Sequence, residues 1–417
     1  MESTNPLIEN DAVTLGLLMT VLALVFYTSA SDSVFFRRFY RVVPTILLCY
    51  FLPALMNTFG LISGENSQLY FVASRYLLPA SLVLLTLSID LKSILKLGPK
   101  ALIMFLAGTT GIIVGGPLAL FIVSLFYPDV LGGAGAEETW RGLATIAGSW
   151  IGGSANQTAM LEVFGASPTL FAQMIAVDVI VANIWMAVLL YWAAKPEVID
   201  GRFGADSSVI ESLKSKVEQY RKSIMKIPSM ADTMVILGLG FFVTGLSHLF
   251  ADILAPWIRE NYPSLRQYSL DSSFFWIVIL ATTGGLLLSF TRMRKLEGAG
   301  ASRLGSVLLY VLVATIGMQM DLRAVLDNPV FFLIGMLWML VHIIIMLVVA
   351  YFIKAPFFFV AVGSQANVGG AASAPIVASA FNPSLAPVGV LLAVLGYAVG
   401  TYGAYICGIL LQGAFGG

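Results

Sequence analysis

Long apolar runs dominate the chain, and ten of them are long enough to cross a membrane. A helix needs about 20 apolar residues to span ~30 Å of hydrocarbon. Two further segments, about 140–165 and 355–381, are apolar but are interrupted by polar, glycine-rich stretches. The pattern predicts an all-α polytopic membrane protein. The ten uninterrupted runs cover 11–29, 42–63, 69–89, 100–127, 168–194, 231–254, 273–291, 302–320, 329–353 and 384–413.

The composition supports this fold class and excludes others. The 417 residues are 58% hydrophobic and 11% charged, whereas soluble domains carry roughly 25% charged residues. The formal net charge is zero, so we expect a lipid bilayer and no nucleic acid as partner. The two histidines form no His-Glu-x-x-His pattern, and Cys49 and Cys407 both lie in apolar runs. We therefore expect no cofactor, and no metal other than a Na⁺ that the polar stretches could hold.

The two polar stretches, 148–158 and 363–373, are the strongest functional signal. Paired glycines let the backbone leave helical geometry, and unwound backbone at membrane depth must line a cavity or be buried in protein. Freed carbonyl and hydroxyl oxygens suit Na⁺, and helix N-termini suit a carboxylate. The alternative is close helix packing on small residues. The predicted ligands are Ser149, Gly152, Gly153, Ser154, Asn156, Gln157 and Thr158 in the first stretch, and Ser364, Gln365, Asn367, Gly369, Gly370 and Ser373 in the second.

Asp178 adds a carboxylate in the middle of the segment 168–194, with no basic residue within four positions. An ionisable side chain at this depth is costly and is a functional hypothesis by default. We assign it to cation coordination or proton exchange; the alternative is a hydrogen-bonded Asp that ties helices together. Asn183, five residues on, is a second candidate that could face the same cavity.

Other polar residues have structural readings as well. Glu162 fits a vestibule near the outer surface. Arg75 either extends to the interface or serves as a substrate counter-ion. His342 is read as a hydrogen-bonded core histidine rather than a proton relay. Asp90 and Asp321 close helices beside basic residues and are read as interfacial ends.

The two halves of the chain share an order of features. Each has an apolar segment closed by an Asp-Leu pair, then an apolar segment, then the glycine-rich stretch, then a short turn ending in proline, then a last apolar segment. This shared order of features indicates an internal repeat. The predicted domains are an N-terminal repeat, 1–194, a cytoplasmic linker, 195–230, and a C-terminal repeat, 231–417. The linker carries an apolar helical stripe over 209–224, typical of a solvated helix or of one lying on the membrane surface.

Basic residues decide between two topologies, because cytoplasmic loops are enriched in Lys and Arg. If both glycine-rich segments are re-entrant hairpins, eighteen basic residues lie inside and four outside, with the N-terminus outside. If both segments cross fully, nine lie inside and thirteen outside. The count favours two inverted repeats of five crossings and one hairpin each. Broken crossing helices, giving 12–13 crossings, remain the rival.

The core 148–156, followed by Asp178 and Asn183, resembles the YjcL-like integral membrane proteins, a family of unknown function. The resemblance covers nearly the whole chain. It implies the superfamily of cation:proton antiporters and anion transporters, with inverted repeats, discontinuous segments and elevator-type movement. With re-entrant hairpins in both halves, the chain also resembles the sodium/glutamate and sodium/citrate symporters. The residues around the glycines differ, however, so the substrates of those symporters cannot be assigned to this chain.

These observations predict a secondary active transporter and not an enzyme. The first hypothesis is a Na⁺- or H⁺-coupled symporter of a small organic anion or amino-acid-like solute, placed in the cytoplasmic (inner) membrane and forming a homodimer through 11–63 and 231–291. The alternative is a cation/proton antiporter. An intramembrane enzyme would need Ser149 or Ser154 to meet His342, and nothing in the sequence places them together.

Overall fold

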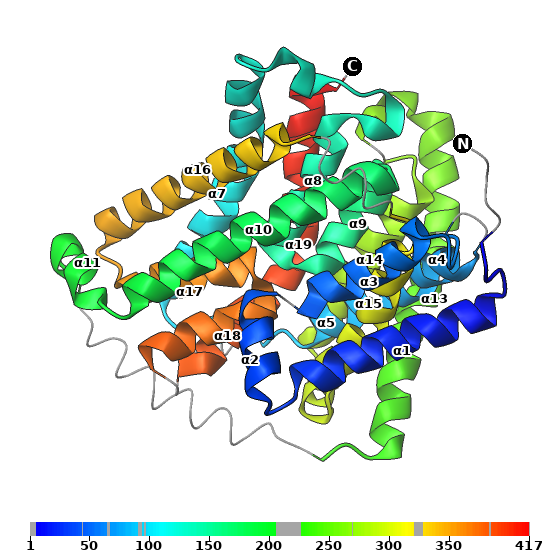
Figure 1. Cartoon of the computed structure of the whole chain (residues 1–417), viewed down its shortest axis with the longest axis horizontal. Coiled ribbons are helices and arrows are strands. Elements are labelled where there is room, and N and C mark those ends of the chain that lie inside the picture. Colours follow the sequence, from blue (N-terminus) through cyan, green and yellow to red (C-terminus); the bar gives the residue numbers. More distant parts are fainter. Residues whose placement is uncertain are drawn as a thin grey trace.

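The chain folds into a bundle of helices, many of them long and apolar. In the computed structural model (Figure 1) residues 6–416 are described, except 44, 65–66, 91–93, 96, 206–226, 269, 321–327 and 383–384. Within these residues one isolated parallel β-bridge joins Ile8 to Ile62, and the other regular structure is helical. The expected linker helix at 209–224 and Asp321 lie outside the described residues.

The predicted apolar runs correspond to helices with similar bounds. The first half contains α1 (Asp11–Ser29), α2 (Val34–Val42), α3 (Thr45–Thr58), α4 (Leu69–Val72), η1 (Ala73–Leu77), α5 (Leu78–Leu87), α7 (Pro99–Ser124), η2 (Pro128–Leu131), η3 (Gly135–Glu137), α8 (Thr139–Gly152), α9 (Ser154–Phe164), α10 (Pro168–Ala193) and α11 (Pro196–Phe203). The second half contains α13 (Met230–Asn261), η4 (Pro263–Tyr268), α14 (Ser273–Ser289), η5 (Arg292–Ala299), α15 (Ala301–Gly317), α16 (Val330–Ile353), α17 (Phe357–Val368), α18 (Gly370–Phe381) and α19 (Ala386–Phe415).

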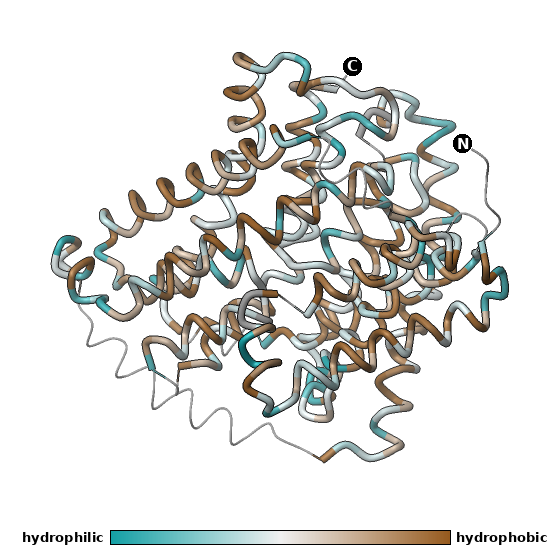
Figure 2. Tube along the Cα trace, in the orientation of Figure 1, coloured by the Kyte–Doolittle hydropathy of each residue, from teal (hydrophilic) through white to brown (hydrophobic). Residues whose placement is uncertain are grey.

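Length and hydropathy make this a multi-pass membrane protein. Among the described residues, seven helical stretches are long and apolar enough to cross a membrane, or nine if two bent helix pairs each form one span. α15 is a further apolar helix of 17 residues. Figure 2 shows hydrophobic positions along most of α1 and α16, as expected for helices that face lipid.

The helices pack into two groups, each drawn from both halves of the chain. The flanking group contains α1, α3, the continuous helix α4–η1–α5, α13, α14 and α15, which pack extensively on one another. The hairpin group contains α7, α8, α9, α10, α16, α17, α18 and α19. Contacts between the groups are fewer and involve chiefly α5 and α14 against α9 and α19. The third apolar segment of each half, 69–89 and 302–320, therefore packs in the flanking group with the first two segments of that half.

Both glycine-rich segments form helical hairpins. At the open end of the first, Trp140 of α8 packs on Phe164 of α9 with ring centroids 5.6 Å apart. At the open end of the second, Phe358 of α17 packs on Phe381 of α18 at 5.3 Å. Each pair joins the start of one arm to the end of the other, so the chain reverses at the glycines.

A charged side chain fastens the open end of each hairpin. Arg141 bonds Glu138 at 2.7 Å, donates to the carbonyl of Phe164, and so ties the start of α8 to the end of α9. At the second hairpin, the Asp200 carboxylate of α11 accepts the backbone N–H of Phe357 at 2.7 Å. This bond satisfies one of the orphan donors at the N-terminus of α17, and the negative charge suits that helix end.

Candidate functional site

The two hairpins approach α19 from opposite ends and meet near its middle. A β-carbon placed on Gly396 would lie 2.8 Å from the carbonyl oxygen of Ile151 in α8 and 3.5 Å from that of Ala366 in α17. Toward the start of α19, Gly389 packs on the backbone of Ala374 in α18. Toward its end, Gly408 packs on the Phe164 ring of α9. Figure 1 shows α19 (red) beside both hairpins.

The reversal in each hairpin is made by a glycine with positive φ. Gly153 has φ 78° and lies between α8 and α9, while Gly370 has φ 57° and begins α18. Residues with a β-carbon rarely adopt these angles. The predicted unwinding at the paired glycines is thus limited to one or two residues, and the arms remain helical up to the turn.

Asp178 of α10 connects both arms of the first hairpin. Its carboxylate accepts hydrogen bonds from Ser149 Oγ at 2.6 Å and Trp150 Nε1 at 2.6 Å, both in α8. It also accepts one from Gln157 Nε2 in α9 at 3.1 Å. The residue is buried, and three donors compensate its negative charge. These contacts are those of an Asp that ties helices together, and cation coordination stays a prediction.

Asn156 fastens the first hairpin to α19. Its Nδ2 donates to the carbonyls of Gly152 and Tyr397, each at 3.0 Å, and its Oδ1 accepts from Thr401 Oγ1. Both amide protons and the amide oxygen are therefore satisfied within the protein. In this conformation Asn156 binds the neighbouring helix, and none of its protons is free for a ligand.

Asn367 fastens the second hairpin to α7. Its Nδ2 donates to the carbonyls of Phe105 and Gly363, each at 2.9 Å, and its Oδ1 accepts from Thr109 Oγ1 at 2.7 Å. The side chain is fully buried. Like Asn156, Asn367 donates both of its side-chain amide protons to acceptors within the protein.

Ser364 links the second hairpin to α10 and α16. His342 Nδ1 lies 3.0 Å from the carbonyl of Gly108, which can only accept, so Nδ1 carries a proton. In the neutral ring Nε2 then accepts from Ser364 Oγ at 2.8 Å, while Trp185 Nε1 donates to the same hydroxyl at 2.8 Å. His342 is thus a hydrogen-bonded core residue, and its serine partner is Ser364 rather than Ser149 or Ser154.

Gln365 is left with an unsatisfied polar atom near the turn of the second hairpin. Its Nε2 donates to Ser373 Oγ at 2.8 Å. Both atoms occupy the space that a β-carbon on Gly369 would need. Its Oε1 is buried and has no hydrogen-bond partner among the described residues. Exchanging the two amide atoms would pair the oxygen with Ser373 and leave the nitrogen unpaired. Buried groups of this kind are rare, so this oxygen is the strongest candidate for a ligand contact.

The remaining predicted residues are scattered. Ser154 is half-buried at the turn, beside Gly153. Thr158 is buried and donates to the carbonyl of Ser154 at 2.9 Å. Asn183 donates to the carbonyl of Val179 in its own helix at 2.7 Å, a turn and a half beyond Asp178. The structure therefore brings Ser149, Gln157 and Asp178 together and leaves Asn183 outside that cluster.

Sequence reasoning missed a tyrosine of the flanking group. Tyr50 of α3 is buried near Asp178 and Thr158 and packs on Phe171 of α10 at 6.2 Å. Its buried hydroxyl has no hydrogen-bond partner of normal geometry among the described residues. A Tyr inside an apolar segment was the available signal, because a buried phenol normally finds a partner.

An ion pair joins the two groups of helices. Arg75 Nη2 lies 3.3 Å from Glu162 Oε2, and the Tyr70 hydroxyl donates to the same carboxylate. Arg75 lies in the π-helical turn η1 and its guanidinium covers the Phe274 ring at 4.4 Å. Single π-turns inside α-helices occur often at functional sites. Neither reading of Arg75 from sequence included this partner.

The chemistry available at the meeting point is that of oxygen ligands and helix ends. α8 and α17 end at the turns, and α9 and α18 begin there. The site therefore combines partial negative charge from two helix C-termini with partial positive charge from two N-termini. Among the described residues, no three His, Cys, Asp or Glu side chains form a metal-binding group.

The fold defines a class, the multi-pass helical membrane proteins. Residues 16–414 match the family described as "Protein of unknown function (DUF819)", and the chain belongs to that family. It is also 24% identical over 354 residues to the uncharacterized membrane protein YjcL of Bacillus subtilis (strain 168), an alignment that covers 81% of this chain and 82% of the relative. The resemblance to YjcL-like proteins is thereby confirmed.

Proposed function

We propose that this protein is a secondary active transporter of a small solute, with its binding site where the two hairpins meet. The observation that carries the proposal is the convergence of both hairpins on Gly396. Matched helix interruptions in two halves of a membrane protein are the best sequence pointer to a transport site. From Gly389 to Gly408, α19 rises about 28 Å at ~1.5 Å per residue, close to the hydrocarbon thickness.

The topology that we propose has ten crossings and two re-entrant hairpins. α1, α3, α4–η1–α5, α7 and α10 cross in the first half, and α13, α14, α15, α16 and α19 cross in the second. The hairpins then enter from opposite faces, and the halves are inverted repeats, as the basic-residue count favours. The protein would lie in the cytoplasmic membrane. Its N-terminus would face the outside, and the linker 195–230 would lie on the cytoplasmic side.

The helix grouping supports elevator-type movement. The flanking group would act as scaffold and as the contact surface of a homodimer, and the hairpin group would carry the solute. Polar contacts between the groups include Arg75 with Glu162, Thr282 with Thr401 at 3.2 Å, and Thr283 with Tyr402 at 2.7 Å. The two hydrogen bonds among these contacts are individually weak in membranes, so they can exchange as one group slides against the other.

The mixed polarity of the site suits coupled symport of an anion with a cation. The N-termini of α9 and α18 favour a carboxylate, whereas the C-termini of α8 and α17, with the Gln365 oxygen, favour Na⁺. The substrate class that we propose is a small organic anion or amino-acid-like solute. The protein would need no bound cofactor, and we propose no enzymatic activity.

Cation/proton antiport is the alternative, favoured by Asp178. This carboxylate is buried and has no basic hydrogen-bond partner among the described residues, and in an antiporter it would exchange a proton for a cation. An antiporter would release protons when Na⁺ is added, and Asp178→Asn would abolish the release. Solute uptake that persists in Asp178→Asn would instead indicate symport with a lesser role for this residue.

A thermal-shift screen tests the proposal, because a ligand that binds only the native fold raises the apparent melting temperature. Purified protein is heated with Na⁺, K⁺, pH steps and small anions. Gln365→Leu should remove the stabilisation by the active ligand. Gln412→Leu is the matched control, since Gln412 also has a buried Oε1 without a partner among the described residues but lies near the end of α19.

Two results would overturn the site. If no ion or solute stabilises the wild-type protein, the converging hairpins are a packing arrangement only. If a ligand does stabilise it and Gln365→Leu keeps the whole effect while Gln412→Leu loses it, the ligand binds elsewhere.

A further inference from the structure

The short helix α2 is nearly perpendicular to the helix that follows it in the chain. It is bent by 88° from α3 and follows the end of α1. Tyr40 anchors it, because its hydroxyl lies 2.7 Å from Thr28 Oγ1 and donates to the carbonyl of Val25 at 3.0 Å. If α3 crosses the membrane, α2 lies along the membrane surface.

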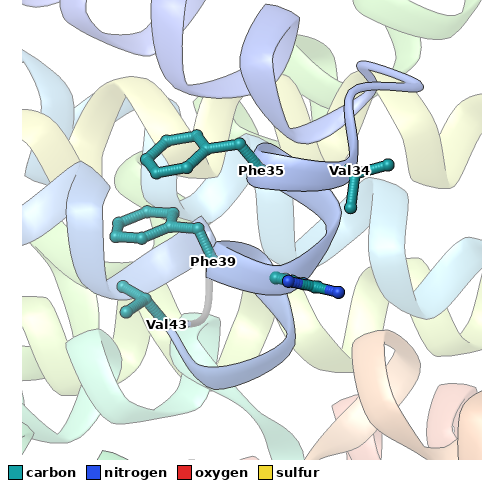
Figure 3. A pocket seen from close by; sticks show the side chains of 5 residues that line it. Val34, Phe35, Phe39 and Val43 are labelled. Atoms are coloured by element: carbon teal, nitrogen blue, oxygen red, sulfur yellow. The ribbon is translucent and has the colours of Figure 1, made fainter.

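One face of α2 is apolar and open. Val34, Phe35, Arg38, Phe39 and Val43 line a groove of about 560 Å³ (Figure 3). The rings of Phe35 and Phe39 are nearly parallel, 10° apart, with centroids separated by 6.4 Å. Phe35 is 69% exposed. An apolar face on a helix that lies at the interface buries itself among acyl chains.

The charges on α2 itself are positive, and the nearest acid in sequence is the exposed Asp32, two residues before the helix begins. Arg37 and Arg38 are exposed, and neither has an ion-pair partner in the described part of the chain. The sequence 34–43 also contains Arg41 and has no acidic residue. Arg38 lines the groove together with the apolar residues. A phosphate attached to an acyl chain has this combination of features, and Arg pairs well with phosphate.

We propose that α2 binds an anionic phospholipid. Its acyl chain lies against Val34, Phe35 and Phe39, and its phosphate pairs with Arg38 and Arg37. This contact is separate from the solute site, since it involves the connection between α1 and α3 and no residue of the hairpins.

A fluorescent label tests the proposal. Cys49 and Cys407 are fully buried, so a cysteine introduced by Val34→Cys can be labelled selectively. The labelled protein is reconstituted into vesicles that contain brominated phosphatidylglycerol or brominated phosphatidylcholine with the same chains. We expect stronger quenching by the anionic lipid, with a preference of roughly fivefold for each arginine that falls as salt is added.

Two comparisons make the test decisive. Arg37→Ala with Arg38→Ala should remove the preference while thermal unfolding stays unchanged, and inorganic phosphate should not compete. Leu340→Cys in α16, which is exposed at 49%, should be quenched equally by both lipids. Equal quenching at position 34, a preference that survives loss of both arginines, or no quenching by either lipid would overturn the proposal.

Discussion

Asn156 and Asn367 make the same set of three hydrogen bonds, one within their own hairpin and two to a helix of the other half of the chain. Each Nδ2 donates to the carbonyl four residues earlier and to a carbonyl on the partner helix. Each Oδ1 accepts from the threonine four residues beyond that partner carbonyl, Thr401 in α19 and Thr109 in α7. The two hairpins are thus held by equivalent clamps.

Replacing either clamp should weaken the fold by a similar amount. Asn156→Ala and Asn367→Ala each remove three hydrogen bonds, and at ~0.6–2 kcal/mol per bond in membranes we expect a loss of about 2–6 kcal/mol. Thermal unfolding in detergent measures it. Asn183→Ala is the control, because it removes one bond within its own helix and should cost under about 1 kcal/mol. Equal effects of all three variants would refute the clamp.

Glycine at 396 should be required for the hairpins to meet. In Gly396→Ala the added methyl lies 2.8 Å from a backbone oxygen, and such overpacking costs typically ~1–3 kcal/mol. Gly413→Ala, in the same helix, has no atom within 4 Å of the added carbon and should stabilise the helix by up to about 1 kcal/mol. The two substitutions should therefore shift the melting temperature in opposite directions, and a shift of the same sign would contradict this packing.

Asp178→Asn should loosen the first hairpin from α10. The carboxylate accepts from Trp150 on one oxygen and from Ser149 and Gln157 on the other, whereas an amide offers a single oxygen. A donor then faces the new NH₂ group, at a cost of about 1–3 kcal/mol. Near-ultraviolet circular dichroism should report the altered Trp150 environment. Ser149→Ala, which removes one donor only, should change it less, and an unchanged spectrum in Asp178→Asn would argue against the hub.

Cross-linking tests relative movement of the two groups. Tyr70→Cys with Glu162→Cys joins the flanking group to the hairpin group, and a bismaleimide across this pair should stop uptake of the stabilising ligand into proteoliposomes. Trp140→Cys with Phe164→Cys joins two arms of one hairpin and should leave uptake intact. Full uptake with the first pair cross-linked would exclude sliding at this boundary.

Local pattern predicted the elements well, because run length and hydropathy determine membrane helices. The run 11–29 matches α1 and 168–194 matches α10 to one residue. The run 42–63 fits less well, since the chain turns between α2 and α3 and α3 begins only at Thr45. Paired glycines located both hairpin turns.

Contacts between residues far apart in the chain could not be predicted from the local sequence pattern. Trp185 and Ser364 are 179 residues apart, and nothing local signals that an indole of α10 holds the second hairpin. The pairing of Arg75 with Glu162 is similar, because both residues were assigned separate roles. Asn156 was expected to face a ligand. In this conformation it instead makes its hydrogen bonds within its hairpin and to the neighbouring helix α19.

The clamp on Asn156 has a consequence for biosynthesis. Its partner carbonyl in α19 lies 241 residues further along the chain, and at ~5–20 residues per second that helix is made roughly 10–50 s later. During this interval the first hairpin, though already synthesised, has an asparagine without its final partners inside an apolar environment. The nascent protein must therefore shelter this segment, in the insertion machinery or among earlier helices, until its last helix arrives.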